Sequence, residues 1–354
     1  MNRAADTLAL AESLLEQRCL SKALYFFDRA QHMGADLDRC SAGRWMAAML
    51  SGDFEAGWRE SDSIWRRNPC DSNRFWQGED LLDKHIIIRC LHGFGDAVQF
   101  LRYVPVLKTF AKHIVVECAP EMVELARCFA GVETVITWNS NATALAAPVW
   151  DVQLEITELP YVLRCSLASL PFSTNYLKLP PYALRYAQQA LGPYTQPRIG
   201  VTWAAGEWNP MRSLPFDTLR PILNHTEYQF WNLQGGPVRD HWQSLVPQAN
   251  CRDHPALDNA GLIPLAAIIS QLDLVITVDT LAAHLAGALN VPCFLMLQYA
   301  ADWRWMIDRD DSPWYPSLRL FRQPRRGDWS GVIDQVDSVL ANYISQDSKA
   351  RSVA

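Results

Sequence analysis

The sequence lacks the features that mark membrane-spanning, secreted and nucleic-acid-binding proteins. None of its 354 residues belongs to an uninterrupted apolar run of about 18 or more, the length that a membrane-spanning helix requires. Residues 1–15 carry charges and contain no apolar core of the kind that defines a signal peptide. A net charge of −6 and a pI near 5.8 argue against a nucleic-acid binder, whose surface is usually basic. We therefore expect a cytoplasmic protein with no membrane span and no nucleic-acid partner.

The chain is also poor in metal-binding and nucleotide-binding motifs. Its nine cysteines are scattered and none forms a CxxC pair, which is typical of reduced thiols that act as small core residues. Its glycine turns lack the GK[ST] sequence of a P-loop and the third glycine of the dinucleotide fingerprint. The sequence therefore predicts neither a metal site nor a bound cofactor.

What the chain does contain is enough apolar material for several cores. Apolar residues make up 49% of the sequence, and its length gives room for two or three domains. An Asn68-Pro69 break precedes the polar stretch 71–83, and residues 180–197 form a linker with proline at both ends and a short helix inside. We predict a helical cap at 1–75, α/β domains at 76–190 and 191–327, and a closing helix with a tail at 328–354.

The helical cap is predicted to hold four helices, at residues 4–17, 20–33, 38–50 and 53–67. Residues 19–25 align with residues 52–58 at an offset of 33, close to the tetratricopeptide period of about 34 residues. Two repeats are fewer than a free-standing array needs, so we expect the cap to dock on the next domain or on another subunit, as in a homodimer. An ordinary helical cap and a peptide-binding repeat surface both fit this pattern.

The first α/β domain opens with a strand and a glycine turn. Residues 86–88 (Ile-Ile-Ile) indicate a buried strand, residues 92–96 (HGFGD) form the turn, and an amphipathic helix follows from Ala97. The remaining elements predicted for this domain are strands at 113–118, 131–137 and 150–154 and a helix at 120–129.

A second unit of the same kind lies about 180 residues downstream. Residues 274–278 predict a buried strand, Asp279 and Thr280 interrupt the apolar run, and residues 282–289 predict a helix. Ligands of parallel sheets bind at the carboxyl ends of strands, and a helix N-terminus there favours phosphate. His284 lies four residues past Thr280, on the same face of the helix. The other elements predicted for this part are strands at 198–203, 228–233 and 291–297 and helices at 262–271 and 328–343.

Four segments together resemble the heptosyltransferase-like glycosyltransferases, in the branch that joins tetratricopeptide repeats to such a domain. They are residues 92–105, 212–216, 272–292 and 302–329, and the resemblance covers nearly the whole chain. It implies a GT-B fold, in which two Rossmann-like domains face each other across a cleft. It also implies an acceptor-side first domain, a nucleotide-sugar donor on the second domain, and an inverting transfer that needs no metal.

An inverting transfer needs one base that takes the proton of the acceptor hydroxyl. The resemblance makes Asp96 that base, because it matches the aspartate of the family's GxGD turn, here built by Gly93 and Gly95. A helix N-cap is the alternative, since aspartate is favoured there and Asp96 stands at the start of the predicted helix.

On the donor side, the resemblance first implies roles for two residues that flank a loop. Thr202 ends a strand, where its hydroxyl and backbone would meet a phosphate. Arg212 would neutralise the diphosphate as the glycosidic bond breaks, in place of a metal ion. The loop between them departs from the family, because residues 203–211 carry Glu207 and no lysine or histidine where relatives have a basic loop rich in glycine and asparagine. This departure leaves the donor, and activity itself, open.

Four further residues complete the implied donor site. Thr280 and the backbone N–H groups after it would hold phosphate at the helix start. Asp279 would bind a sugar hydroxyl or cap the helix, and His284 would contact phosphate or sugar unless it is only a hydrogen-bonded helix residue. Gln234, at the end of a strand, would approach the nucleoside.

The segment 302–315 is unusually rich in aromatic and charged residues. Trp303, Trp305, Trp314 and Tyr315 lie there among several aspartates and arginines. Tryptophans stack on sugar rings, so a sugar-binding lip is one interpretation. The other is packing, in which the aromatic side chains clamp the two domains or support the terminal helix.

Three classes of function fit these observations. The first is an inverting glycosyltransferase whose acceptor is a glycan, a lipid-linked glycan or a protein. The second is another nucleotide-sugar enzyme on the same fold, such as an epimerase, which would need no acceptor. The third is a catalytically weak scaffold with repeats and a nucleotide site. No residue pattern identifies the donor sugar or the base of its nucleotide.

Overall fold

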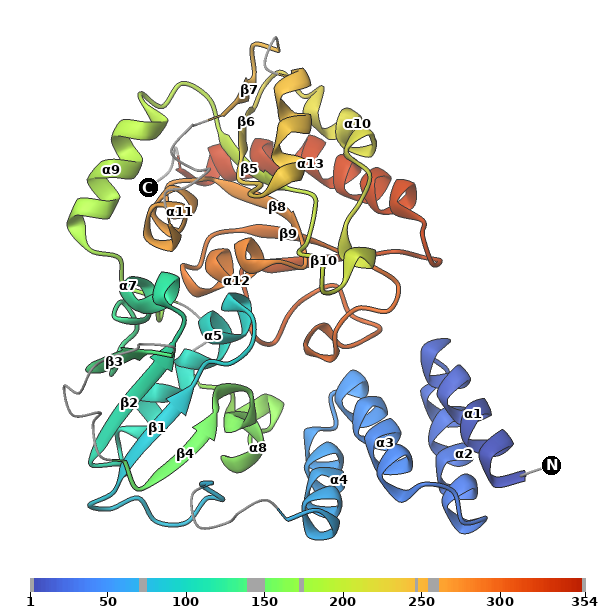
Figure 1. The fold of residues 1–354 in the computed structure, drawn as a ribbon. Coiled ribbons are helices and arrows are strands. Elements are labelled where there is room, and N and C mark those ends of the chain that lie inside the picture. Colours follow the sequence, from blue (N-terminus) through green and yellow to red (C-terminus); the bar gives the residue numbers. More distant parts are fainter. Residues whose placement is uncertain are drawn as a thin grey trace.

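The computed structural model describes residues 3–69, 75–138, 150–171, 175–245, 248–253 and 261–351. Four helices at the beginning of the chain stand beside a first parallel sheet, and a second parallel sheet with its own helices lies above both in Figure 1. None of the helices in the described part is long and apolar enough to cross a membrane.

The helical cap forms as the periodicity predicts, within two residues at each end. Its four helices are α1 (Arg3–Glu16), α2 (Leu20–His32), α3 (Leu37–Ser51) and α4 (Phe54–Arg67). Asp36 and Asp53 are the N-cap residues of α3 and α4, and the carboxylate of each accepts a backbone N–H from the first turn of its helix. Successive helices pack against each other. Their assignment as tetratricopeptide repeats stays a prediction.

The first sheet has four parallel strands in the order β3-β2-β1-β4. The strands are β1 (His85–Arg89), β2 (His113–Cys118), β3 (Thr134–Thr137) and β4 (Val152–Glu155). Around them lie the short helices α5 (Phe94–Phe100), α6 (Val104–Leu107), α7 (Val123–Ala126) and α8 (Leu159–Val162). The predicted helix 120–129 is shorter than expected, because Pro120–Met122 is a 3-10 turn and α7 ends at Ala126.

The helix after the glycine turn begins three residues earlier than predicted. Gly93 is its N-cap, α5 starts at Phe94, and Asp96 therefore lies inside the first turn rather than before the helix. The single helix expected from Ala97 is divided, since Leu101–Tyr103 is a 3-10 turn and Pro105 stands in the first turn of α6.

The second sheet has six parallel strands in the order β10-β9-β8-β5-β6-β7. Its strands are β5 (Arg198–Thr202), β6 (Gln229–Asn232), β7 (Cys251–Arg252), β8 (Leu274–Val278), β9 (Cys293–Leu297) and β10 (Leu318–Arg322). The central strands β5 and β8 are buried along their whole length, as expected for a parallel sheet covered on both faces. The sequence predicted neither β7 nor β10, and β7 is only two residues long.

Helices cover both faces of the second sheet. Residues of α11 (Leu262–Ile269) and α12 (Leu281–Ala288) share a core with the first sheet, whereas α10 (Arg220–Leu223) and α13 (Trp329–Arg351) contribute to a separate core on the other face. The linker helix α9 (Pro181–Leu191) packs on α11. The helix α13 begins one residue after its predicted start and runs past the predicted end at residue 343.

The aromatic segment 302–315 clamps the three parts of the chain together. Trp305, Trp314 and Tyr315 are fully buried, so they do not form an exposed sugar-binding lip. The Trp314 ring contacts Phe54 of α4 and Phe100 of α5, at centroid distances of 6.0 and 5.9 Å. Packing between the parts is therefore the interpretation that the structure supports.

Candidate functional site

Three of the predicted donor-side residues meet at one edge of the second sheet. Thr202, the last residue of β5, is in register with Thr277 of β8, and Asp279 and Thr280 follow directly. Thr280 is the N-cap residue of α12, and its hydroxyl lies 3.1 Å from that of Thr277. The parallel order of β5 and β8 explains the meeting, because the carboxyl ends of parallel strands share an edge.

The Thr202 hydroxyl is a candidate ligand contact at this edge. The residue is 5% exposed, and its Oγ1 has no hydrogen-bond partner within the described part of the chain. Buried hydroxyl groups are normally hydrogen-bonded, so an unpaired one at the end of a strand needs an explanation such as a bound ligand or water.

Arg212 reaches the same edge from the loop that follows β5. Its Nη1 donates to the backbone carbonyl of Asp279 at 3.0 Å, and its Nε donates to the carbonyl of Asn209 at 3.4 Å. Its guanidinium lies 5.5 Å from the ring centroid of Trp208, which is 86% exposed. Glu207 of the same loop is exposed as well.

Gln234 uses its side-chain amide within the protein. Its Oε1 accepts the backbone N–H groups of Trp203 and Ala204, at 3.1 and 2.9 Å. Its Nε2 donates to the carbonyls of Ala204 and Gly235, at 3.2 and 3.0 Å. The side chain therefore fixes the start of the loop that carries Arg212, and its approach to a nucleoside stays a prediction.

Asp279 is a buried carboxyl group with altered acidity. It is 8% exposed, and burial together with the neighbouring Asp302 carboxylate raises the pKa of Asp279 to about 6. Arg212 and Arg304 oppose this shift without cancelling it. A carboxyl group whose pKa is raised toward neutral pH in this way is common at functional sites.

His284 is buried and neutral. Burial, reinforced by the Arg304, Arg102 and Arg212 cations, lowers the pKa of His284 to about 3. Its Nδ1 lies 3.0 Å from the hydroxyl of Tyr315. The imidazole is therefore a polar but uncharged group at ordinary pH.

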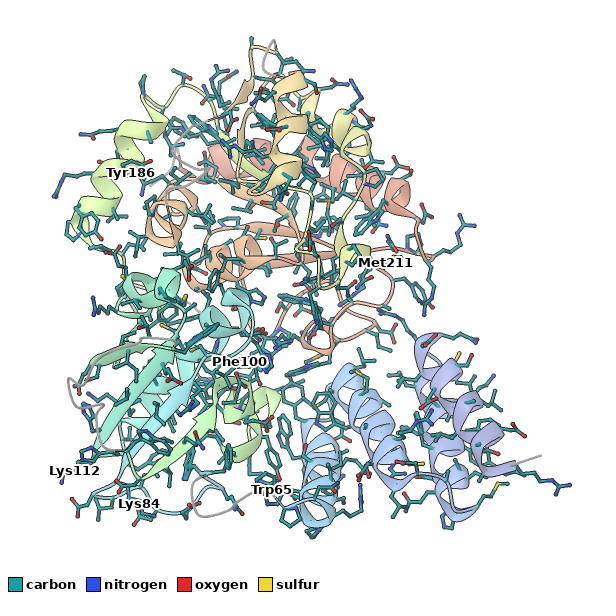
Figure 2. The ribbon with its side chains drawn as sticks, in the orientation of Figure 1. Trp65, Lys84, Phe100, Lys112, Tyr186 and Met211 are labelled. Atoms are coloured by element: carbon teal, nitrogen blue, oxygen red, sulfur yellow. The ribbon has the colours of Figure 1, made fainter. Side chains whose placement is uncertain are left out.

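The glycine turn of the first part packs directly on His284. A Cβ atom placed on Gly95 would lie 2.7 Å from the His284 Cδ2 and 3.2 Å from its Nε2. Only glycine permits so close an approach. The helices α5 and α12 pack against each other at this point, which brings the turn onto the sheet edge described above. Figure 2 shows Phe100, the last residue of α5, near the boundary between the part of the chain that holds the first sheet and the part that holds the second sheet.

Asp96 forms two different interactions with its two oxygens. Oδ2 accepts the backbone N–H of Gly93 at 3.1 Å, which closes the first turn of α5. Oδ1 accepts Nη2 of Arg304 at 2.5 Å. The N-cap alternative is therefore wrong in its detail, because Gly93 is the cap residue and Asp96 stabilises it from the first turn. A carboxylate has about four lone pairs, so Asp96 can still accept a proton from a substrate hydroxyl.

Sequence reasoning missed two residues beside this site. Arg304 and Asp302 lie in the loop after β9, which neighbours β8 in the sheet, and the two side chains form an ion pair of 2.9 Å. The available signal was the density of charges between the tryptophans in a loop that leaves a carboxyl strand end.

A third missed residue, Arg102, connects the parts beneath the site. It is 1% exposed, and it donates to the Trp314 carbonyl at 2.7 Å and to the Tyr176 hydroxyl at 3.0 Å. Its guanidinium also lies 4.6 Å from the ring centroid of Tyr315, the partner of His284. Nothing in the sequence distinguishes this arginine from an exposed one.

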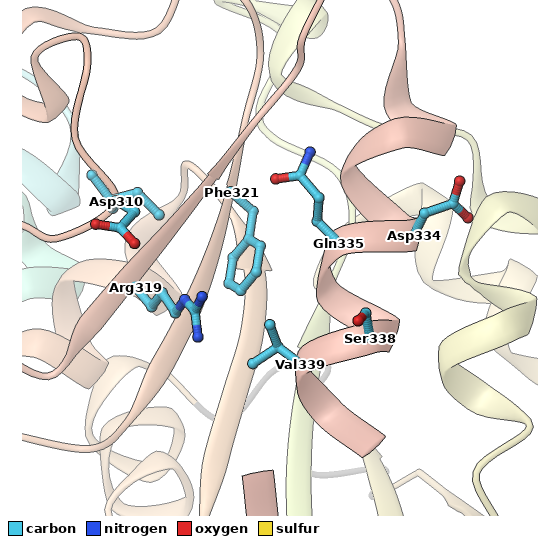
Figure 3. A pocket seen from close by; sticks show the side chains of 8 residues that line it. Asp310, Arg319, Phe321, Asp334, Gln335, Ser338 and Val339 are labelled. Atoms are coloured by element: carbon cyan, nitrogen blue, oxygen red, sulfur yellow. The ribbon is translucent and has the colours of Figure 1, made fainter. Parts of the chain in front are cut away.

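Neither a metal-binding group nor the surface pocket in Figure 3 coincides with this site within the described residues. No group of three or more histidine, cysteine, aspartate or glutamate residues could hold a metal ion within the described residues. Figure 3 shows a shallow hollow between β10 and α13, lined by Asp310, Arg319, Phe321 and Gln335 among others, and none of the predicted site residues lines it.

Comparison with known proteins gives one curated relative and several structures. No family model matches the sequence. The chain is 26% identical over 337 residues to the protein FlbA of Caulobacter vibrioides, with 87% of this chain aligned. The aligned part is 56% of FlbA, so the chain spans little more than half the length of that relative.

Among solved structures, a glycosyl transferase of family 9 from Veillonella parvula matches with a TM-score of 0.54 and 15% identity, over 74% of this chain and 97% of that one. The ADP-heptose lps heptosyltransferase II of E. coli matches with a TM-score of 0.54 and 14% identity, over 73% and 99%. The E. coli heptosyltransferase WaaC with ADP-2-deoxy-2-fluoro heptose gives 0.50 and 14%, over 74% and 99%. The chain thus has the α/β fold with parallel sheets of the family 9 glycosyl transferases.

Proposed function

We propose that the chain is an inverting glycosyltransferase that needs no metal and moves a sugar from a nucleoside-diphosphate sugar to a hydroxyl group. The observation that carries this proposal is the junction of the two parts. It brings the Asp96 carboxylate of α5 to 2.5 Å from Arg304, in the part whose sheet edge carries Thr202, Asp279 and Thr280. The fold supports the proposal at a coarser level, because the similar solved structures are described as a glycosyl transferase and a heptosyltransferase.

The donor would bind at the sheet edge, with its diphosphate at the start of α12. Thr280 and the following N–H groups would hold a phosphate there, and the Thr202 hydroxyl, unpaired within the described residues, would supply a further contact. Arg212 already reaches this point, and its Nη2 has no hydrogen bond among the described residues, so it is free to neutralise the departing diphosphate. One structural neighbour is described with a bound ADP-sugar, which makes ADP the first nucleotide to test.

Asp96 would act as the base. It lies at the face of the first part that packs on the donor edge, and it has lone pairs left after its two hydrogen bonds. Asp279 and His284 would contact the sugar, the first as an acceptor and the second as a neutral donor or acceptor.

The acceptor would be a glycan, a lipid-linked glycan or a protein. The helical cap packs on the aromatic segment beside the site, so a protein or a second copy of the chain bound by the cap would lie near the reaction. We further propose that the chain acts in the cytoplasm and forms a homodimer. Its domains are the helical cap at 1–75, the α/β domains at 76–190 and 191–327, and the closing helix with its tail at 328–354.

Thermal unfolding with ADP, UDP, GDP and their sugar conjugates tests the donor site. A ligand at about 100 times its dissociation constant stabilises a protein by roughly 2.7 kcal/mol. We expect one nucleotide to shift the transition of the wild type and of Asp96→Asn, and to leave Arg212→Ala unshifted. Arg220→Ala is the matched control, because Arg220 lies eight residues further on and pairs with Asp217 on the surface.

Product analysis then separates the three classes of function. A transferase releases the nucleoside diphosphate and gives a glycosylated acceptor, and Asp96→Asn abolishes both products. A new sugar epimer formed without acceptor would show an epimerase. Nucleotide binding with no turnover by any conjugate would contradict the proposal and favour a scaffold.

A further inference from the structure

Arg304 lies at the junction between the part of the chain that holds the first sheet and the part that holds the second sheet. It belongs to the 3-10 turn Trp303–Trp305 in the second part, and its side chain is 13% exposed. The guanidinium lies 5.1 Å from the ring centroid of Phe100, the last residue of α5, and 5.1 Å from that of Trp303. This side chain is therefore held between an aromatic residue of each part.

Its two terminal nitrogens bind carboxylates from opposite parts. Nη2 donates to Oδ1 of Asp96 at 2.5 Å, and Nη1 donates to Oδ1 of Asp302 at 2.9 Å. Asp302 is itself fixed, because the same oxygen also accepts the backbone N–H of Arg304 at 2.9 Å. The guanidinium is planar, so the position of one carboxylate determines where the other one binds.

This geometry controls the orientation of Asp96. Its Oδ2 is held by the N–H of Gly93 and its Oδ1 by Arg304, so both oxygens are fixed. Without Arg304 the carboxylate would keep one hydrogen bond and rotate about its side-chain torsions. A displacement of about 1 Å at a reacting group costs about 100-fold in rate.

We propose that Arg304 is a positioning residue, which orients the Asp96 carboxylate across the junction for the transfer reaction. This inference rests on the proposed function. In this role Arg304 acts on Asp96 rather than on phosphate, because each terminal nitrogen already donates to a carboxylate and these two carboxylates offset its charge, while its Nε is buried, without a partner in the described part of the chain. Loss of Arg304 should therefore affect turnover much more than donor binding.

The test uses Arg304→Gln, Arg304→Lys and Asp302→Asn, with Arg309→Gln as the control. Arg309 lies in the same segment and pairs with Asp311 at the surface. Affinity for ADP, UDP and GDP is measured by calorimetry. Turnover is measured by release of the nucleoside diphosphate from ADP-heptose, UDP-glucose and GDP-mannose, with the sugar passing to an added glycan acceptor or, in its absence, to water. Hydrogen exchange of the peptide 91–100 reports on the first turn of α5 without any need for activity.

We expect Arg304→Gln to lower kcat about 100-fold while nucleotide affinity changes less than about threefold. Arg304→Lys should recover about tenfold, since it restores the charge but not the planar fork. Exchange in the peptide 91–100 should rise in Arg304→Gln and remain at the wild-type level in Arg309→Gln. A loss of affinity equal to the loss of kcat, or unchanged exchange, would overturn the proposal.

If Arg304→Gln does not fold, Asp302→Asn takes its place, because the amide oxygen keeps the backbone hydrogen bond while loss of the charge weakens the hold on Arg304. The same change also removes a carboxylate that raises the pKa of Asp279. It should lower kcat about tenfold and raise the same exchange. If the wild type turns over no conjugate, the proposed function fails, and exchange alone then decides: a rise in Arg304→Gln supports the positioning of Asp96, and no rise overturns it.

Discussion

Replacement of Asp279 by asparagine should stabilise the folded protein near neutral pH while it impairs the proposed donor site. Burial and the Asp302 carboxylate raise the pKa of Asp279 from 3.8 to about 6. Between these values the folded protein keeps a proton that the unfolded chain has released, so stability falls as pH rises through this window. The difference between these two pKa values corresponds to about 3 kcal/mol of stability, lost in full above about pH 6.

The measurement is urea unfolding of the wild type and of Asp279→Asn at pH 4.5 and pH 7.5. About 1 kcal/mol is already lost at pH 4.5, so about 2 kcal/mol remains to be lost by the wild type between the two pH values. The variant has no proton to release there. Its stability relative to the wild type should therefore rise by about 2 kcal/mol from pH 4.5 to pH 7.5.

The comparison of two pH values removes the main complication. Any cost of fitting an amide at this position is the same at both pH values and cancels. Asp311→Asn is the control, because a hydrogen bond from Arg309 lowers the pKa of Asp311, so that carboxyl group is ionised in both states throughout the range and its difference should stay flat. A flat difference for Asp279→Asn would refute the reasoning.

Two further predictions concern the junction and the second core. Gly95→Ala should destabilise the protein by about 1–3 kcal/mol in thermal unfolding, because the added Cβ would lie 2.7 Å from the His284 ring. Unchanged stability would contradict this prediction and would mean that α5 and α12 can move apart to accommodate the methyl group. For His225, burial lowers the pKa, but hydrogen bonds with Glu227 and Asp337 outweigh burial and raise it. This raised pKa contributes stability below about pH 6.5 that is lost as pH rises through the folded pKa, so His225→Gln should lower the melting temperature at pH 6 more than at pH 9, and an equal loss at both would contradict it.

The elements that the sequence predicted well have a regular apolar pattern, which is periodic in the helices of the cap and unbroken in the central strands. The strand β8 has the predicted limits, because five aliphatic or β-branched residues in a row are buried on both faces. The strand β10 escaped prediction because Arg319 and Arg322 interrupt its apolar residues, and Arg319 is exposed at the edge of the sheet. The start of α5 was predicted too late in the chain. Glycine stands at its N-cap and again in its first turn, and the low helix propensity of glycine gave no indication of a helix there.

For the candidate site too, some features could be predicted from the sequence and others could not. Parallel strands place their carboxyl ends on one edge, so the order of strands and helices along the chain is enough to bring the polar residues at the ends of β5 and β8 together. The role of Gln234 in fixing the loop 203–211 could not be predicted, because its four hydrogen bonds depend on how that loop folds.

The sequence alone thus determined the two α/β parts, the helical cap and the sheet edge that carries Asp279 and Thr280, because local periodicity and strand ends specify them. Only the tertiary structure decided what lies opposite that edge. The bond between Arg304 and Asp96 joins residues 208 positions apart, and that between Arg102 and Trp314 joins residues 212 apart. Such contacts leave no periodic trace, because they form only when α5 packs on α12 and the aromatic segment closes over both.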